Sequence, residues 1–305
     1  MAVPAQCPLC GHSREHVNVI TRHVYGGKPG QAFYRCGHCD VSYLYPGLTP
    51  EEEKKFYAAE FSSFMSGRAG SAAGWEEPEK HVKANDWMVA RRMKYLEPRL
   101  PKKGRVLEIG CSSAFMLYPL VARGLECFGV EPSGVFADYV RSRGIECYET
   151  VEDLTAGDAV GPGFDLVLHA FVLEHISTPQ QFLQQQLDLL KPGGRLIFEV
   201  PNSAEPLLTL YDVPAFERFY WIVAHTWYFS ERSLQYLLGK LGYPFEILLD
   251  QRYDLSNHMV WARDGRPGGM GRFTPQFGRE IEDQYRQALV QSRHCDTLVA
   301  VVKKE

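Results

Sequence analysis

Eight cysteines are present, and four of them form two Cys-x-x-Cys pairs near the start of the chain. Cys7 and Cys10 make the first pair, and Cys36 and Cys39 make the second. Four thiolates in this arrangement suit a closed tetrahedral Zn²⁺ site, which leaves no position open to a substrate. The spacing therefore predicts a structural zinc ion in a small zinc ribbon over residues 1–46.

A second group of residues that could bind a ligand surrounds Gly110. The apolar run over 106–109 predicts a buried parallel strand, and small residues over 110–114 lead into a helical pattern. A strand, a tight turn and a helix bring backbone N–H groups close to a ligand. Glu108 can order this turn or meet a cationic ligand group. Phe115 disfavours a dinucleotide site, which needs a small residue there for close helix–strand packing.

Acidic residues follow the next two expected strands. Glu131, followed by Pro132, comes about 20 residues after the glycine turn, where a carboxylate can accept hydrogen bonds from both hydroxyls of a ribose. After the third strand, Val151 could pack on an adenine ring, and Glu152 or Asp153 could accept from its exocyclic amine. These residues predict the binding of an adenosyl group.

The elements that must position these residues alternate between strand and helix. Strands are expected at 105–109, 126–130, 145–148, 164–169 and 194–200, with helices at 115–123, 134–143 and 179–190. Such alternation with short connections predicts an α/β fold with a doubly wound parallel sheet. Ligands of such sheets bind at the carboxyl ends of the strands, which is where the acidic residues and the glycine turn lie.

The region between the cysteines and this sheet is expected to be helical, as a linker or lid over 47–100. Thr49 followed by Pro50 is typical of a helix start. Residues 62–74 are rich in Ser, Gly and Ala, which favours a mobile linker. A helix is predicted over 79–97, and its buried face is expected to contain Val82, Trp87, Val89, Ala90, Met93 and Leu96.

Two further blocks complete a recognisable pattern. Phe164-Asp-x-Val is followed by Leu173-Glu-His, and Leu190-Lys-Pro-Gly-Gly precedes the fifth strand. Together with the acidic-x-Gly turn, they resemble the class I S-adenosylmethionine (SAM) dependent methyltransferase family over about residues 104–202. The resemblance implies a seven-stranded Rossmann-like sheet whose last strand, expected at 296–302, is antiparallel.

The same resemblance assigns residues to the cofactor. It implies that Gly110, Glu131 and His169 line the SAM site, with Glu108 at the strand end and Ser112 in the glycine turn. Ser112 and Ala114 replace two glycines of the family pattern. The domain would extend over 101–305.

The segment that begins His225-Thr-Trp-Tyr-Phe-Ser resembles natural-product and sugar-modifying methyltransferases, some of which carry an N-terminal zinc module. An aromatic insertion over about 204–240 could roof an acceptor pocket, although at least half of its rings are expected to be ordinary core. An oxygen or carbon acceptor needs a base with a near-neutral pKa. His225 is the first candidate for this base, and His258 and Tyr253 are the others.

The composition of the chain limits the kinds of partner that we expect it to bind. The chain has 305 residues, 45% of them hydrophobic, and a net charge of −4. This mild negative charge disfavours nucleic acid, and no apolar run reaches a membrane-spanning length. We expect a cytoplasmic enzyme with reduced cysteines that methylates a small polar metabolite. The alternatives are a ribosomal RNA methyltransferase, a nicotinamide-dependent oxidoreductase, and a SAM-binding or protein-binding module without activity.

Overall fold

The computed structural model describes residues 3–56, 61–69, 77–157 and 160–305. Within these residues, a mixed seven-stranded sheet has the order β10-β11-β8-β7-β4-β5-β6. Its strands are β4 (Arg105–Ile109), β5 (Glu126–Val130), β6 (Glu146–Tyr148), β7 (Phe164–Ala170), β8 (Leu190–Pro201), β10 (Phe245–Asp250) and β11 (Thr297–Lys303). β11 runs antiparallel to both of its neighbours, whereas β8, β7, β4, β5 and β6 are parallel. The predicted Rossmann-like methyltransferase sheet is confirmed.

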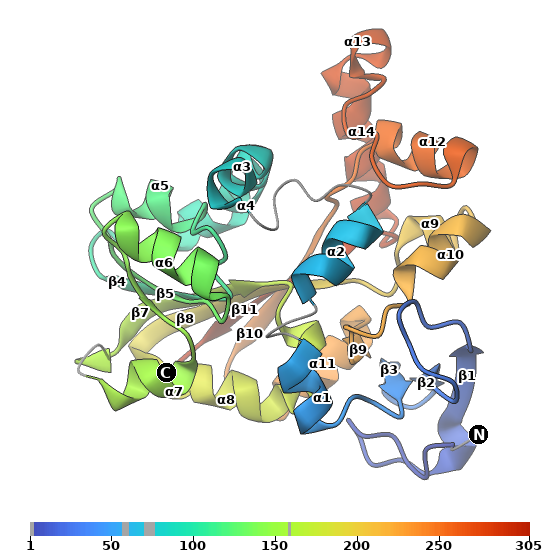
Figure 1. Cartoon of the computed structure of the whole chain (residues 1–305), viewed down its shortest axis with the longest axis horizontal. Helices are drawn as coiled ribbons and strands as arrows, with labels where there is room; N and C mark the ends of the chain where they lie inside the picture. Colours follow the sequence, from blue (N-terminus) through green and yellow to red (C-terminus); the bar gives the residue numbers. More distant parts are fainter. Residues whose placement is uncertain (1–2, 57–60, 70–76, 158–159) are drawn as a thin grey trace.

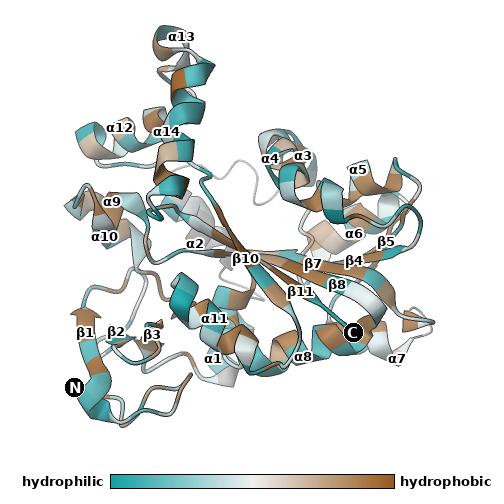
Figure 2. Cartoon of the chain, turned by 180° about the vertical axis from the view of Figure 1, so that it is seen from behind, coloured by the Kyte–Doolittle hydropathy of each residue, from teal (hydrophilic) through white to brown (hydrophobic). Residues whose placement is uncertain are grey.

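Helices cover both faces of this sheet (Figure 1). α3 (Pro78–Ala84), α4 (Asp86–Leu96), α5 (Leu117–Val121) and α6 (Gly134–Ser142) lie on one side, and α7 (Val151–Ala156), α8 (Pro179–Leu189) and α11 (Glu231–Gly239) lie on the other. Alternate strand residues supply two separate cores, with Val106 in the first and Leu107 in the second. The brown, hydrophobic colour of the central strands in Figure 2 reflects this burial on both faces.

The N-terminal cysteine-containing unit forms a second sheet, which is completed by a distant segment. Its strands are β1 (Val17–Thr21), β2 (Ala32–Cys36), β3 (Ser42–Tyr45) and β9 (Trp227–Tyr228), in that order. β3 and β9 pair antiparallel, with Tyr43 opposite Trp227. The ribbon expected over 1–46 therefore shares its sheet with the segment that carries His225.

Two insertions extend the fold. α9 (Pro206–Thr209), α10 (Pro214–Tyr220) and β9 follow β8, and α12 (Leu255–Asp264), α13 (Thr274–Phe277) and α14 (Arg279–Gln291) lie between β10 and β11. The second insertion projects from the sheet as an arm (Figure 1). None of the helices in the described ranges is long and apolar enough to cross a bilayer.

The segment before the sheet differs from expectation in two respects. Residues 61–69 form helix α2 (Phe61–Ala69) where a mobile linker was predicted, and 70–76 lie outside the described residues. The single helix predicted over 79–97 is interrupted at Asn85, between α3 and α4. α1 (Pro50–Lys55) begins as predicted, because the Thr49 side chain accepts a hydrogen bond from the N–H of Glu52.

The buried face of α4 also differs from the prediction. Trp87 is 40% exposed, whereas Arg91 and Arg92 are buried. Arg91 Nη2 donates to Glu199 Oε1 over 2.5 Å, and Arg92 Nε donates to Glu199 Oε2 over 2.9 Å. Tyr95 also donates to this carboxylate. An acid within the fifth parallel strand, β8, therefore draws two arginines inward, which the apolar pattern of the helix did not reveal.

This ion-pair network predicts a specific pH dependence of stability. Burial disfavours the charge of Glu199, but Arg92 and Arg91 outweigh it and lower its pKa from 4.5 to about 2. The folded state therefore gains about 3 kcal/mol above about pH 4.5, and this gain is lost as the pH falls toward about 2. Urea unfolding of the wild type and Glu199→Gln over this range measures the effect. Glu199→Gln is expected to be less stable by about 3–5 kcal/mol at neutral pH, because buried Arg92 and Arg91 both lose this ion pair, although Arg91 keeps its second ion pair with Asp250. Equal stability of the two proteins at neutral pH would contradict this.

Candidate functional site

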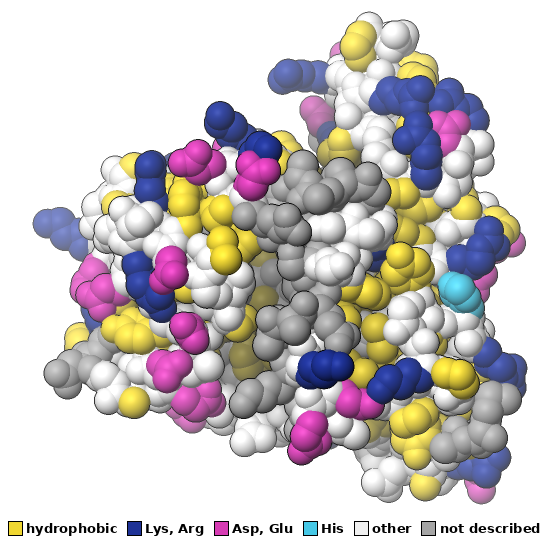
Figure 3. Space-filling model, viewed as in Figure 1, with side chains coloured by type: hydrophobic (Ala, Val, Ile, Leu, Met, Phe, Trp, Pro, Cys, Tyr) yellow, Lys and Arg dark blue, Asp and Glu magenta, His cyan; other side chains and the backbone are white. Residues whose placement is uncertain are grey.

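A cleft of about 1010 Å³ lies at the carboxyl ends of β4, β5 and β7. In the space-filling view, hydrophobic side chains gather along a hollow that borders the α3–α6 side (Figure 3). The described residues that line the cleft include Glu53, His81, Arg92, Glu108, Gly110, Ser112, Phe115, Glu131, Pro132, Glu149, Phe171, His175 and Phe182. The cleft therefore lies where parallel α/β sheets bind their ligands.

The turn after β4 contains a glycine that cannot be replaced without strain or a clash. Gly110 has a φ of +70°, and a Cβ there would lie 2.7 Å from Val172 Cγ2. Ser112 and Ala114 also have positive φ, of 50° and 57°. The two residues that replace the family glycines thus keep a glycine-like backbone, and Ser112 remains in the cleft wall.

Replacing Gly110 by alanine is therefore expected to weaken the binding of adenosyl ligands by at least about tenfold, because the turn must shift away from Val172. Titration calorimetry with S-adenosylhomocysteine (SAH) measures this. Gly124→Ala is the matched control. Gly124 also has a positive φ, of +84°, but open space surrounds its Cβ position. Equal affinities of the two variants would show that the Gly110 turn does not hold the ligand.

Glu131 is held at the cleft wall by its own turn and by the glycine turn. Its Oε2 accepts the N–H of Ser112 over 2.8 Å, and its Oε1 accepts the N–H of Ser133 over 2.9 Å. Burial raises its pKa, and the two N–H donors oppose that rise. The carboxylate is thus oriented at the end of β5, and it fits the predicted role toward a ribose.

Glu108 presents a buried acceptor to the same cleft. It is 3% exposed, and its Oε2 has no hydrogen-bond partner among the described residues. Burial raises its pKa to about 8, against the influence of Arg92. A cationic ammonium group would satisfy this oxygen and favour the ionised form. The cleft therefore fits the amino acid end of SAM as well as its ribose.

Three predicted cofactor residues are not among the described residues that line the cleft. The His169 ring is buried and stacks on Phe198, with centroids 4.7 Å apart, and burial lowers its pKa to about 3. Val151 and Glu152 begin α7. Glu149 lines the cleft instead. Its position directly after β6, like that of Glu131 after β5, was the sequence signal that could have found it.

The three candidates for a base lie in different parts of the fold. His225 lies beside His175, which lines the cleft, with ring centroids 4.8 Å apart. His258 Nδ1 is hydrogen-bonded to the hydroxyl of Tyr285, within the arm. The backbone N–H of Tyr253 donates to Asp296. His225 is thus placed against a residue of the cleft wall.

The aromatic insertion packs inward more than predicted. Phe216, Tyr220, Trp221, Trp227, Tyr228 and Phe229 are all at most 7% exposed. Several of these rings form a core with Phe33 and Leu44 of the ribbon, and none is among the described residues of the cleft wall. These rings join the insertion to the N-terminal unit, and they do not roof the cleft as expected.

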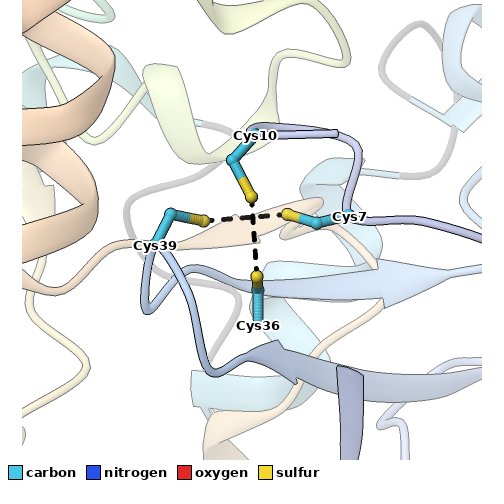
Figure 4. A group of neighbouring side chains, drawn as sticks. All are labelled: Cys7, Cys10, Cys36 and Cys39. Carbon is cyan, nitrogen blue, oxygen red and sulfur yellow. Dashed lines mark hydrogen bonds between the residues drawn. The ribbon is translucent and has the colours of Figure 1, made fainter. Parts of the chain in front are cut away.

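The four cysteines of the two Cys-x-x-Cys pairs converge as predicted (Figure 4). The Sγ atoms of Cys7 and Cys39 are 3.7 Å apart, and those of Cys10 and Cys36 are 3.6 Å apart. Zn–S bonds of about 2.3 Å in a tetrahedron place the sulfurs about 3.8 Å from one another. The donor set and its spacing therefore fit a zinc ion.

The sheet order, the glycine turn and the oriented acid define a class I SAM-dependent methyltransferase domain. A protein family described as "Methyltransferase domain" matches residues 84–246, which is more than half of the chain, and the chain belongs to this family. The predicted resemblance to class I SAM-dependent methyltransferases is thereby confirmed.

Individual relatives are more distant. The chain is 26% identical to a ubiquinone biosynthesis O-methyltransferase of Coxiella burnetii (strain Dugway 5J108-111) over 162 residues, which are 51% of this chain and 66% of that protein. It thus spans slightly less than two thirds of that relative. A protein of the same name from Cereibacter sphaeroides (strain ATCC 17025 / ATH 2.4.3) is 27% identical over 222 residues, which cover 63% of this chain and 85% of that protein. A SAM-dependent methyltransferase from Archaeoglobus fulgidus shares the fold, with a TM-score of 0.50, 17% identity, and coverage of 80% and 100%.

Proposed function

We propose that this protein transfers the methyl group of SAM to an oxygen or carbon atom of a small polar metabolite. The observation that carries the proposal is a single cleft that joins the Gly110 turn and Glu131 to His175, beside which His225 lies. The named O-methyltransferase relatives favour oxygen as the acceptor atom. The His225 segment supports a sugar or natural-product precursor as the acceptor.

Different residues of the site would bind the cofactor and remove the proton of the acceptor. Bound SAM supplies an activated methyl group on a sulfonium, so the chain must chiefly align the acceptor and control its protonation. Glu131 would hold the ribose and Glu108 the ammonium group. His225 is the first candidate to take the acceptor proton, because it lies beside His175 of the cleft wall. Burial lowers its pKa well below the ordinary value, which keeps the imidazole neutral but makes it a weaker base than the near-neutral one that the sequence predicts. The four-cysteine site would hold structural zinc, outside the reaction.

The test uses the purified full chain and SAM with a labelled methyl group. Panels of phenols, catechols, sugars and nucleotide sugars are offered, and labelled product and SAH are measured. Acceptor-dependent SAH formation is expected from at least one polar hydroxyl compound. Binding of NAD(H) without binding of SAM or SAH would overturn the proposal. If RNA is the only acceptor methylated, and RNA binding is lost at high salt, then RNA would replace small metabolites as the acceptor class.

A further inference from the structure

Three side chains with metal-binding atoms meet beside the cleft, away from the four cysteines. Glu174 and His175 lie in the 3-10 turn Leu173–His175 that follows β7, and His225 lies between α10 and β9. One candidate ligand atom from each lies within 4.8 Å of the other two. His175 also lines the cleft. The cluster thus joins two segments that are far apart in sequence at the wall of the site.

Two atoms of this cluster are buried without a partner. Glu174 is 1% exposed, and neither its Oε2 nor Nδ1 of His225 has a hydrogen-bond partner among the described residues. A carboxylate oxygen that is removed from water in this way is costly unless it gains a partner. A cation between Glu174 and the histidines would supply that partner.

The third residue of the cluster is oriented by the backbone. His175 Nδ1 lies 2.8 Å from the carbonyl oxygen of Ala224, the residue before His225. A hydrogen bond donated from Nδ1–H to this carbonyl makes Nε2 the ring nitrogen that carries a lone pair. Histidines that bind metals commonly donate their other N–H to a carbonyl in this way. The same contact also ties the two histidine segments together.

We propose that Glu174, His175 and His225 bind one divalent first-row cation that holds the oxygen of the methyl acceptor. Two histidines and one carboxylate are a recurrent catalytic set that leaves positions open to a substrate. Bonds of about 2.1 Å place such ligands about 3–4 Å apart, a spacing that small side-chain rotations reach from the present arrangement. The identity of the acceptor atom in this inference rests on the proposed function above.

The charges around the cluster indicate which kind of acceptor group would bind there. Arg68 acts on both histidines, and Arg252 acts on Glu174 and His225. Glu199 also acts on Glu174, but its charge is paired with Arg91 and Arg92. Asp296 offsets the charge of Arg252, with a closest N–O distance of 3.6 Å. A dication beside one carboxylate and these arginines leaves an excess of positive charge. The site therefore favours an acceptor that binds through an ionised oxygen, such as a catecholate or another acidic hydroxyl.

The cation would replace a general base in the reaction. When the acceptor hydroxyl binds to the ion, its O–H bond breaks, its proton passes to water, and the oxygen keeps the electron pair. That pair then forms the bond to the methyl carbon of SAM, while the carbon–sulfur bond breaks and its electrons remain on sulfur. The products are the methyl ether and SAH. His225 would then act as a ligand and would not carry the proton.

Manganese is a suitable probe, because carboxylate and imidazole ligands accept Mn²⁺ while thiolates prefer zinc. The full chain, with its zinc retained, is titrated with Mn²⁺ alone, and free Mn²⁺ is followed by electron paramagnetic resonance. About one bound Mn²⁺ per chain is expected. Glu174→Gln and His225→Gln should each weaken binding by at least about tenfold. His294→Gln is the matched control, because His294 also has a buried Nδ1 without a partner and lies outside the cluster.

The outcomes separate this inference from the proposed function. Absence of bound Mn²⁺ in the wild type, or undiminished binding in both cluster variants, overturns the cation site. Methyl transfer that persists without bound cation, and is lost in His225→Gln, would return His225 to the role of base. Stoichiometric Mn²⁺ binding without methyl transfer to any acceptor would leave the site standing and overturn the proposed function. SAH binding by each variant verifies that it is folded, and either cluster variant suffices if the other fails to fold.

Discussion

Cys36→Ser is expected to lose the zinc ion, to unfold at a much lower temperature, and to lose methyl transfer. Structural zinc sites of this kind contribute about 10–16 kcal/mol of binding free energy, most of which stabilises the folded state. Cys36 ends β2, whose neighbour β3 pairs with β9. Loss of the ion would therefore loosen Trp227 and Tyr228, which follow His225 closely in the chain.

Zinc content by elemental analysis, thermal unfolding and turnover together measure this effect. Cys127→Ser is the matched control, because Cys127 is also buried but lies outside the four-cysteine site. It is expected to retain about one zinc per chain and most of its activity. A Cys36→Ser protein with unchanged melting temperature and turnover would show that the ribbon is not needed to support the site.

His225→Ala is expected to lower turnover by about 10²–10⁴-fold, the usual contribution of a residue that controls the proton of a reacting group. The affinity for SAH should remain within about twofold, because the residues expected to hold it lie elsewhere: Glu108 in β4, Gly110 in the turn after β4, and Glu131 directly after β5. Steady-state kinetics and calorimetry with SAH separate the two effects.

His294→Ala is the control for this substitution, since it removes a half-buried imidazole outside the cleft wall. Its turnover should stay close to that of the wild type. A His225→Ala protein with full turnover would exclude the residue both as a base and as a necessary ligand. Loss of SAH binding together with turnover would instead indicate that the substitution disturbs the fold of the cleft.

The local sequence pattern was sufficient to predict those features whose structure depends on a short motif. The strand at 105–109, the turn at Gly110 and the acid Glu131 all follow from alternation and from the rule that ligands bind at the ends of parallel strands. The two Cys-x-x-Cys pairs are distant in sequence, but the preference of zinc for four thiolates predicted that they meet. In each case, a short motif with a known geometry or ligand preference was sufficient.

Contacts between distant segments were not visible in the sequence. The burial of Arg91 and Arg92 depends on Glu199, which is more than 100 residues away. The fourth strand of the ribbon sheet, β9, comes from the aromatic insertion, and its rings therefore became core. His169 was placed in the SAM site by family resemblance, but its ring lies on the side of β7 that faces Phe198. A one-residue difference in a strand exchanges the two faces of the sheet.

The arm formed by α12, α13 and α14 begins and ends at two strand residues that are paired with each other. Asp250 and Thr297 are directly opposite each other in the pairing of β10 with β11. Asp296 further ties the base of the arm, because it accepts the backbone N–H groups of Arg252 and Tyr253. Evolution can therefore lengthen, shorten or exchange this insertion without altering strand register. Divergence among family members should concentrate there, while the pairing beneath it stays constant.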